Sequence, residues 1–87
     1  MTYKINVYEM IFFNVATNKG MTKKHYFKKV ETIKGIKYQD INKNYQDAFK
    51  RYTNTMYHIT LLRADEPDNL IEEHNRKMRK YMQLMGV

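Results

Sequence analysis

Two strand-like segments separated by a turn signal are the feature that most constrains how this chain folds. Residues 2–15 alternate with a period of two, and the apolar side chains on one side are Tyr3, Ile5, Val7, Ile11, Phe13 and Val15. Asn18-Lys19-Gly20 predicts a hairpin turn, because Asn and Gly tolerate the positive φ that such connections require. Residues 23–33, rich in aromatic and β-branched side chains, predict a second, antiparallel strand.

Two residues are expected to make this hairpin irregular. Glu9 interrupts the apolar side of the first segment, which predicts either a bulge that exchanges the two faces of the strand or a carboxylate satisfied by a lysine. Of these two alternatives we expect the bulge. Gly35 is expected to end the second strand.

Helix and strand patterns alternate in the rest of the chain. From Asp40 the apolar period changes to 3.6, which predicts a helix with Ile41, Tyr45, Ala48, Phe49 and Tyr52 on its apolar side. Residues 56–63 alternate again and predict a third strand, expected near the centre of the sheet. An acidic segment with a proline, residues 65–68, is typical of a helix start. We expect this second helix to end at Gly86, with an apolar side formed by Leu70, Ile71, His74, Met78, Tyr81, Met82 and Met85.

These patterns predict one small α+β domain over residues 1–87 in the order ββαβα. We expect a three-stranded antiparallel sheet with both helices on one face, which leaves the other face uncovered. A domain of this size buries only about 60–65% of its unfolded surface, so a deep catalytic cavity is difficult to build. Function is therefore expected on the surface.

Composition excludes several classes of site. The chain has neither cysteine nor serine, which removes disulfides, thiolate metal sites and the commonest nucleophiles. The three histidines lack metal-ligand spacing, so we expect no metal and no cofactor. No secretory signal and no apolar run long enough to cross a bilayer is present, and we expect a cytoplasmic protein with no membrane partner.

Positive charge is concentrated in residues 19–37. This segment holds seven lysines and one acid, Glu31, and so carries +6 of the formal net charge of +7. Codon bias towards lysine would spread charge more evenly, and protection of a sheet edge requires fewer lysines than two adjacent pairs. We therefore interpret the segment as a site for a polyanion, most simply RNA. The expected nucleic-acid-binding residues are Lys19, Lys23, Lys24, His25, Tyr26, Phe27, Lys28, Lys29, Lys34 and Lys37.

An aromatic ring is expected among these cations. Because neighbouring residues of a strand point to opposite faces, an uncovered face presents either Tyr26, between Lys24 and Lys28, or Phe27, between His25 and Lys29. A ring flanked by cations binds unstacked bases and phosphates of single-stranded RNA. The alternative is that the exposed ring meets another protein chain or a covering loop.

Three further groups of residues have weaker interpretations. His25 and His58 could meet as an acid–base pair for RNA cleavage, although residue types alone do not establish geometry. The cations of the second helix are expected to be compensated through the i, i+4 spacing of Glu72 and Glu73 with Arg76 and Lys77. An apolar patch for a protein partner or a homodimer is expected from Tyr8, Met10 and Phe12.

A small, basic, cysteine-free chain rich in Lys, Asn, Tyr and Ile resembles the counter-defence proteins of T-even-type bacteriophages, among them phage antitoxins and ToxN inhibitory factors. The resemblance lies in size, charge and overall pattern, and it implies no particular functional residue. It implies a non-enzymatic RNA-binding inhibitor in the host bacterial cytoplasm that neutralises a bacterial ribonuclease toxin through RNA, through direct protein contact or through both. The alternatives are a protein-only inhibitor of a nucleic-acid-processing host enzyme and a small ribonuclease toxin.

Overall fold

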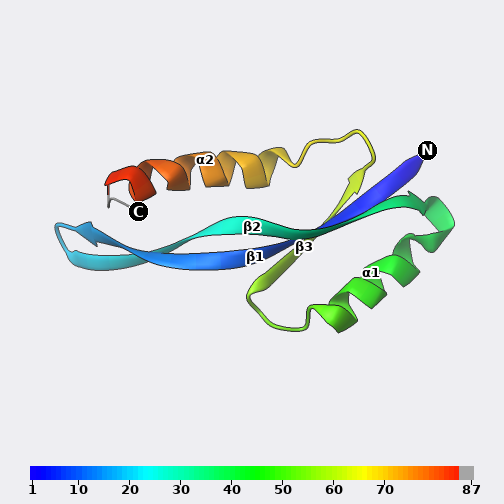
Figure 1. Ribbon diagram of the computed structural model, residues 1–87, viewed down its shortest axis with the longest axis horizontal. Coiled ribbons are helices and arrows are strands. Elements are labelled where there is room, and N and C mark those ends of the chain that lie inside the picture. The colour runs from blue at the N-terminus through cyan, green and yellow to red at the C-terminus, as the bar shows by residue number, and fades with distance from the viewer. Residues whose placement is uncertain (85–87) are drawn as a thin grey trace.

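The first two strands form a hairpin that runs along most of the molecule (Figure 1). The computed structural model describes residues 1–84, so the expected roles of Met85 and Gly86 lie outside the described residues. Strands β1 (Thr2–Thr17) and β2 (Gly20–Lys37) pair along their whole length. The predicted turn connects them, with Gly20 at a φ of +117° that favours glycine.

Both irregularities of the hairpin lie in β2. One register shift makes Val30 the extra residue, and a second lies beside Gly35, whose φ is +71°. The expected bulge at Glu9 is therefore wrong, because β1 alternates without interruption and Glu9 pairs with Lys28. The expected strand end at Gly35 is also wrong, because a glycine with positive φ accommodates the extra residue and β2 continues.

Strand β1 is the centre of the sheet. The strand order is β2-β1-β3, and β3 (Tyr57–Arg63) pairs antiparallel with only the first half of β1. The expectation that the third strand is central is wrong. The first half of β1 is buried on both faces, since Ile5 and Val7 are fully buried and Tyr8, which points the other way, is 5% exposed. Beyond this half the hairpin extends past β3, and the molecule measures 51 × 26 × 18 Å.

Helix α1 (Ile41–Arg51) covers one face of the sheet at the open end of the hairpin (Figure 1). A short 3-10 turn, Tyr38–Asp40, leads into it from β2. Its Ala48 is fully buried and forms the main core with Ile5, Val7 and Ile36. Partly buried apolar residues pack around this core: Tyr3, Ile33, Ile41, Tyr45, Tyr52, Tyr57 and Ile59.

Helix α2 (Asn69–Leu84) lies on the other side of the sheet, along the half of the hairpin that ends in the turn (Figure 1). Ile71 and Met78 are its buried residues. The hydroxyl of Tyr8 donates a 2.9 Å hydrogen bond to the carboxylate of Asp68, just before the helix. Thr60 of β3 donates to the same carboxylate at 3.0 Å, so this polar contact ties the helix start to two strands.

The predicted α+β class and the order ββαβα are confirmed. The predicted placement of both helices on one face is wrong, because α1 and α2 lie on opposite sides (Figure 1). A strand with apolar residues on both faces requires cover on both sides, and each helix supplies one side. Within residues 1–84, no helix is both long enough and apolar enough to cross a membrane.

Candidate nucleic-acid interface

The cations of the predicted site fall into two groups along β2. Five of them lie towards the turn: Lys19, Lys23, Lys24, Lys28 and Lys29. Lys34 and Lys37 lie near the other end of the strand, where Lys37 pairs with Thr2. Five residues of extended strand, from Lys29 to Lys34, separate the two groups by about 17 Å. The predicted residues therefore do not form one patch, and the turn-side group is the denser one.

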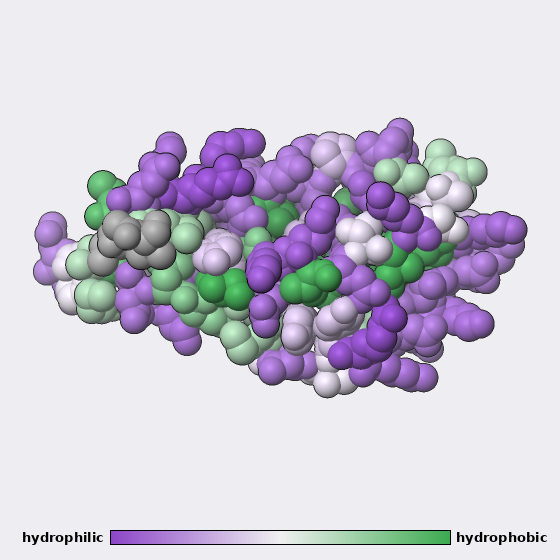
Figure 2. Space-filling view, in the orientation of Figure 1, coloured by the Kyte–Doolittle hydropathy of each residue, from purple (hydrophilic) through white to green (hydrophobic). Residues whose placement is uncertain are grey.

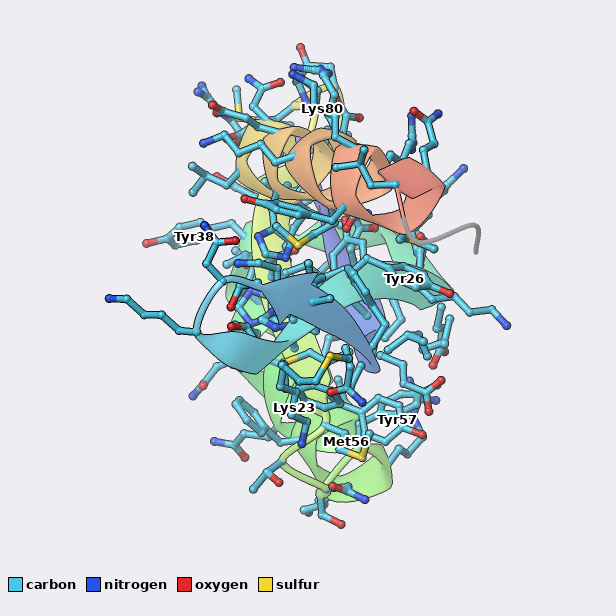
Figure 3. All side chains as sticks on the ribbon, turned by 90° about the vertical axis from the view of Figure 1, so that its left-hand side faces the viewer. Lys23, Tyr26, Tyr38, Met56, Tyr57 and Lys80 are labelled. Atoms are coloured by element: carbon cyan, nitrogen blue, oxygen red, sulfur yellow. The ribbon has the colours of Figure 1, made fainter. Side chains whose placement is uncertain are left out.

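Strand register decides which aromatic ring accompanies the turn-side lysines. Tyr26 is paired with Ile11, and its ring lies 6.4 Å from that of Phe13. By alternation, Lys24 and Lys28 share its face. Tyr26 is half-buried, and Figure 3 shows it near the end of α2 and on a different side of the hairpin from Lys23. Phe27 is equally half-buried, and of the two rings it is the one that contacts His74 of α2.

Phe27 is packed between the sheet and α2. Its ring centroid lies 5.0 Å from that of His74, 5.1 Å from that of His25 and 5.3 Å from that of His58. The ring of Tyr8 meets it edge-on at 6.1 Å. Phe27 is therefore part of the packing that holds α2 in place, and its ring is not a free platform for a base.

Side chains of α2 occupy the outer edge of β2. The backbone N–H of Phe27 donates to Oδ1 of Asn75 at 2.8 Å, and Nδ2 of Asn75 donates to the carbonyl of Phe27 at 2.9 Å. Nε2 of His74 lies 2.8 Å from the carbonyl oxygen of His25 and donates to it. These contacts satisfy backbone groups that an edge strand would otherwise leave unpaired. They fix α2 beside the basic part of the hairpin.

Cations of α2 consequently join those of β2. Arg79 and Lys28 line the same groove, a hollow of about 340 Å³ whose other lining residues are Tyr26, Phe27, Asn75 and Met82. The ammonium of Lys24 lies 4.8 Å from the ring centroid of Tyr81. Figure 2 shows hydrophilic side chains over the outer surface of α2. Helix and strand together therefore form one basic surface.

Charge compensation on α2 is only partial. Lys77 forms the expected ion pair with Glu73, with 3.7 Å between Nζ and Oε1. The structure shows no ion pair for Arg76, Arg79 or Lys80 within the described residues. The expectation that Arg76 is neutralised by Glu72 is thus not met.

The histidines gather around Phe27 in an arrangement that differs from the predicted pair. His25 lies beside His74, with 4.8 Å between ring centroids, whereas His58 contacts the ring of Phe27. Burial, with a smaller contribution from His74, lowers the pKa of His25 below its usual value of 6.5. Among residues 1–84, no group of three or more His, Asp and Glu side chains is placed to hold a metal ion.

The predicted apolar patch is divided. Tyr8 is 5% exposed and bonded through its hydroxyl, so the expectation that it lies on an exposed patch is wrong. Met10 is half-buried, and only Phe12 is exposed. The ammonium of Lys23 lies 4.3 Å from the ring centroid of Phe12. Phe12 therefore lies beside a lysine near the turn and does not form a separate apolar face with Tyr8.

Sequence reasoning missed Asn75 and Arg79. Asn75 lies between Ile71 and Met78 on the buried side of α2, and a polar amide at such a position requires a partner. This need for a hydrogen-bond partner could have indicated from the sequence that Asn75 contacts the edge of the sheet. Arg79 carried no comparable signal, because its role depends on which side of the helix meets β2.

The chain matches no protein-family model, no curated protein and no solved structure.

Proposed function

We propose that this protein is a non-enzymatic RNA-binding inhibitor, a phage counter-defence factor that neutralises a bacterial toxin ribonuclease through bound RNA. One observation carries the proposal. The half-buried ring of Tyr26 shares its face with Lys24 and Lys28 and lines a groove together with Arg79. An aromatic ring among cations is the arrangement that binds the unstacked bases and phosphates of a single strand.

Electrostatics support RNA as the ligand. The segment from Lys19 to Lys37 carries +6 of the net charge, and α2 adds Arg79, which lines the same groove as Lys28. Neutralising phosphates releases counterions, so the affinity is expected to fall with salt at a log–log slope of about −0.7 per phosphate contacted on a single strand. The inhibitor role follows from the resemblance to phage antitoxins and ToxN inhibitory factors.

A pair of charge-reversal variants tests RNA binding. Lys28→Glu with Lys29→Glu places two acids on exposed positions of the basic surface, whereas Lys43→Glu with Lys50→Glu makes the same charge change on α1. Fluorescence anisotropy with a labelled single-stranded RNA should show lost binding for the first variant and retained binding for the second. Equal affinities for both variants would refute a local site. Circular dichroism checks that both variants fold.

Co-purification distinguishes the proposal from a protein-only inhibitor. The tagged protein is purified from bacterial cells that carry a toxin ribonuclease, and its A260/A280 ratio is recorded before and after nuclease treatment. We expect bound nucleic acid and a toxin that is released by nuclease. A toxin that stays bound after nuclease treatment would favour direct protein contact instead.

A further inference from the structure

The groove between the outer edge of β2 and α2 has the chemistry of a site for one nucleotide. Its volume of about 340 Å³ lies at the lower end of the range for pockets that hold small ligands. Tyr26 and Met82 contribute apolar surface from the strand and the helix respectively. Lys28 and Arg79 contribute a cation from each element. An apolar slot with cations from both walls is complementary to a flat base that carries a phosphate.

The residues around this groove are held before any ligand arrives. Tyr26 lies between two residues whose backbone groups are bonded to α2, His25 through its carbonyl and Phe27 through its N–H and carbonyl. The three contacts measure 2.8, 2.8 and 2.9 Å. Strand and helix therefore keep their separation at the groove. A ring that is already positioned loses little entropy when a base stacks on it.

Asn75 can distinguish a base from other flat groups. Its amide carries two N–H donors and two acceptor lone pairs, and the bonds to Phe27 use one of each. One donor and one acceptor therefore remain at the groove. The Watson–Crick edge of a base offers the complementary pattern of acceptors and N–H donors when the base is not paired in a duplex.

We propose that this groove binds a single unstacked nucleotide of single-stranded RNA. The base lies against Tyr26 and Met82, and the adjoining phosphates contact Lys28 and Arg79. Arginine suits the phosphate because its planar fork can donate two parallel hydrogen bonds. This assignment rests on the proposed RNA-binding function and specifies where the strand enters the protein.

The test separates stacking from charge. A fluorescein-labelled oligouridylate is titrated into wild type, Tyr26→Ala and Tyr26→Phe, with Tyr38→Ala as a control because Tyr38 is an exposed tyrosine at the other end of the hairpin. Loss of one stacked base should weaken binding about 5- to 150-fold in Tyr26→Ala. Tyr26→Phe keeps the ring and should bind like wild type, as should Tyr38→Ala.

Salt dependence tests the phosphate contacts. Arg79→Gln and Lys28→Gln should each reduce the log–log salt slope by about 0.7, whereas Lys43→Gln, with the same charge change on α1, should leave the slope unchanged. An oligonucleotide with abasic sites should bind wild type more weakly than oligouridylate and should remove the difference between wild type and Tyr26→Ala. A duplex of the same length should not show the Tyr26 effect.

Failure of the groove and failure of RNA binding give different results. If wild type binds no RNA at low salt, the proposed function and this assignment both fall. If wild type binds and the Tyr26 and Arg79 variants bind equally well, only the groove assignment falls. If a variant does not fold, the assignment is tested on the wild-type protein by the changes in amide chemical shift when oligouridylate is added. The largest changes on adding oligouridylate are expected at Tyr26, Lys28 and Arg79, and changes confined to other residues would overturn the assignment.

Discussion

Replacing Asn75 by alanine is the sharpest perturbation of the contact that organises this surface. The substitution removes both hydrogen bonds to the backbone of Phe27, at 2.8 and 2.9 Å, and leaves an N–H and a carbonyl without partners at a partly buried position. A hydrogen bond contributes about 1 kcal/mol net, and an unsatisfied buried group costs about 1–3 kcal/mol. Because water can reach part of this edge, we expect a loss of about 2–3 kcal/mol in the free energy of unfolding.

This loss is a substantial fraction of the total free energy of unfolding. At about 0.05–0.15 kcal/mol per residue, a chain of 87 residues has a stability of about 4–13 kcal/mol. Asn75→Asp tests the two hydrogen bonds separately. Its carboxylate can accept from the N–H of Phe27 and cannot donate to the carbonyl of Phe27. This variant should also be destabilised. Asn44→Ala is the matched control, since Asn44 lies on α1 and donates one exposed bond to the carbonyl of Asp40.

Urea unfolding followed by circular dichroism measures the stability differences. Hydrogen exchange supplies a local readout, because the N–H of Phe27 is itself the donor to Asn75. A loss of about 2–3 kcal/mol corresponds to exchange about 30- to 150-fold faster at this amide. Stability of Asn75→Ala within about 0.5 kcal/mol of Asn44→Ala, together with unchanged exchange at Phe27, would refute the reasoning.

Two further predictions concern titration. The lowered pKa of His25 means that the unfolded chain binds more protons below about pH 6.5, so stability should fall as pH decreases through this range. His25→Gln should reduce that dependence, and an NMR titration midpoint of 6.5 or higher for His25 would contradict it. Burial and the hydrogen bond to Asp68 raise the pKa of Tyr8 to about 12, so stability should fall above pH 10, where the unfolded tyrosine ionises first. An ultraviolet titration should show a late step near 12 that is absent from Tyr8→Phe, and the same profile for both proteins would exclude the assignment.

Local periodicity was sufficient to predict the elements. Strand and helix periods depend on neighbouring residues, so ββαβα could be inferred from the spacing of apolar side chains. The pairing register of β1 and β2 could not be predicted, because Val30 is an extra residue only relative to the strand with which β2 pairs. The sequence did show that β1 is apolar on both faces, because Ile5 and Val7 lie on one face and Tyr8 lies on the other. The position of one helix on each face could not be predicted, because it depends on how much of the sheet each helix covers.

The basic surface was only partly predictable for a related reason. The lysine-rich segment of β2 was recognisable in the sequence. Strand alternation reduced the candidates for an aromatic ring among these lysines to Tyr26 and Phe27. Choosing between them required knowing that α2 packs on Phe27. Arg79 entered the site through the same packing. Residues that act across an interface between elements are positioned by tertiary structure, and a single sequence does not display that position.

The contact between β2 and α2 contains no ion pair among the described residues, and both elements carry cations. Lys28 and Arg79 line one groove, and bringing two cations together opposes docking of the helix. The contacts that oppose this repulsion are an amide, a histidine and the ring of Tyr81 beneath Lys24. A bound phosphate would remove the repulsion and so favour the docked helix. If the protein binds a polyanion as proposed, binding and docking of α2 should strengthen each other.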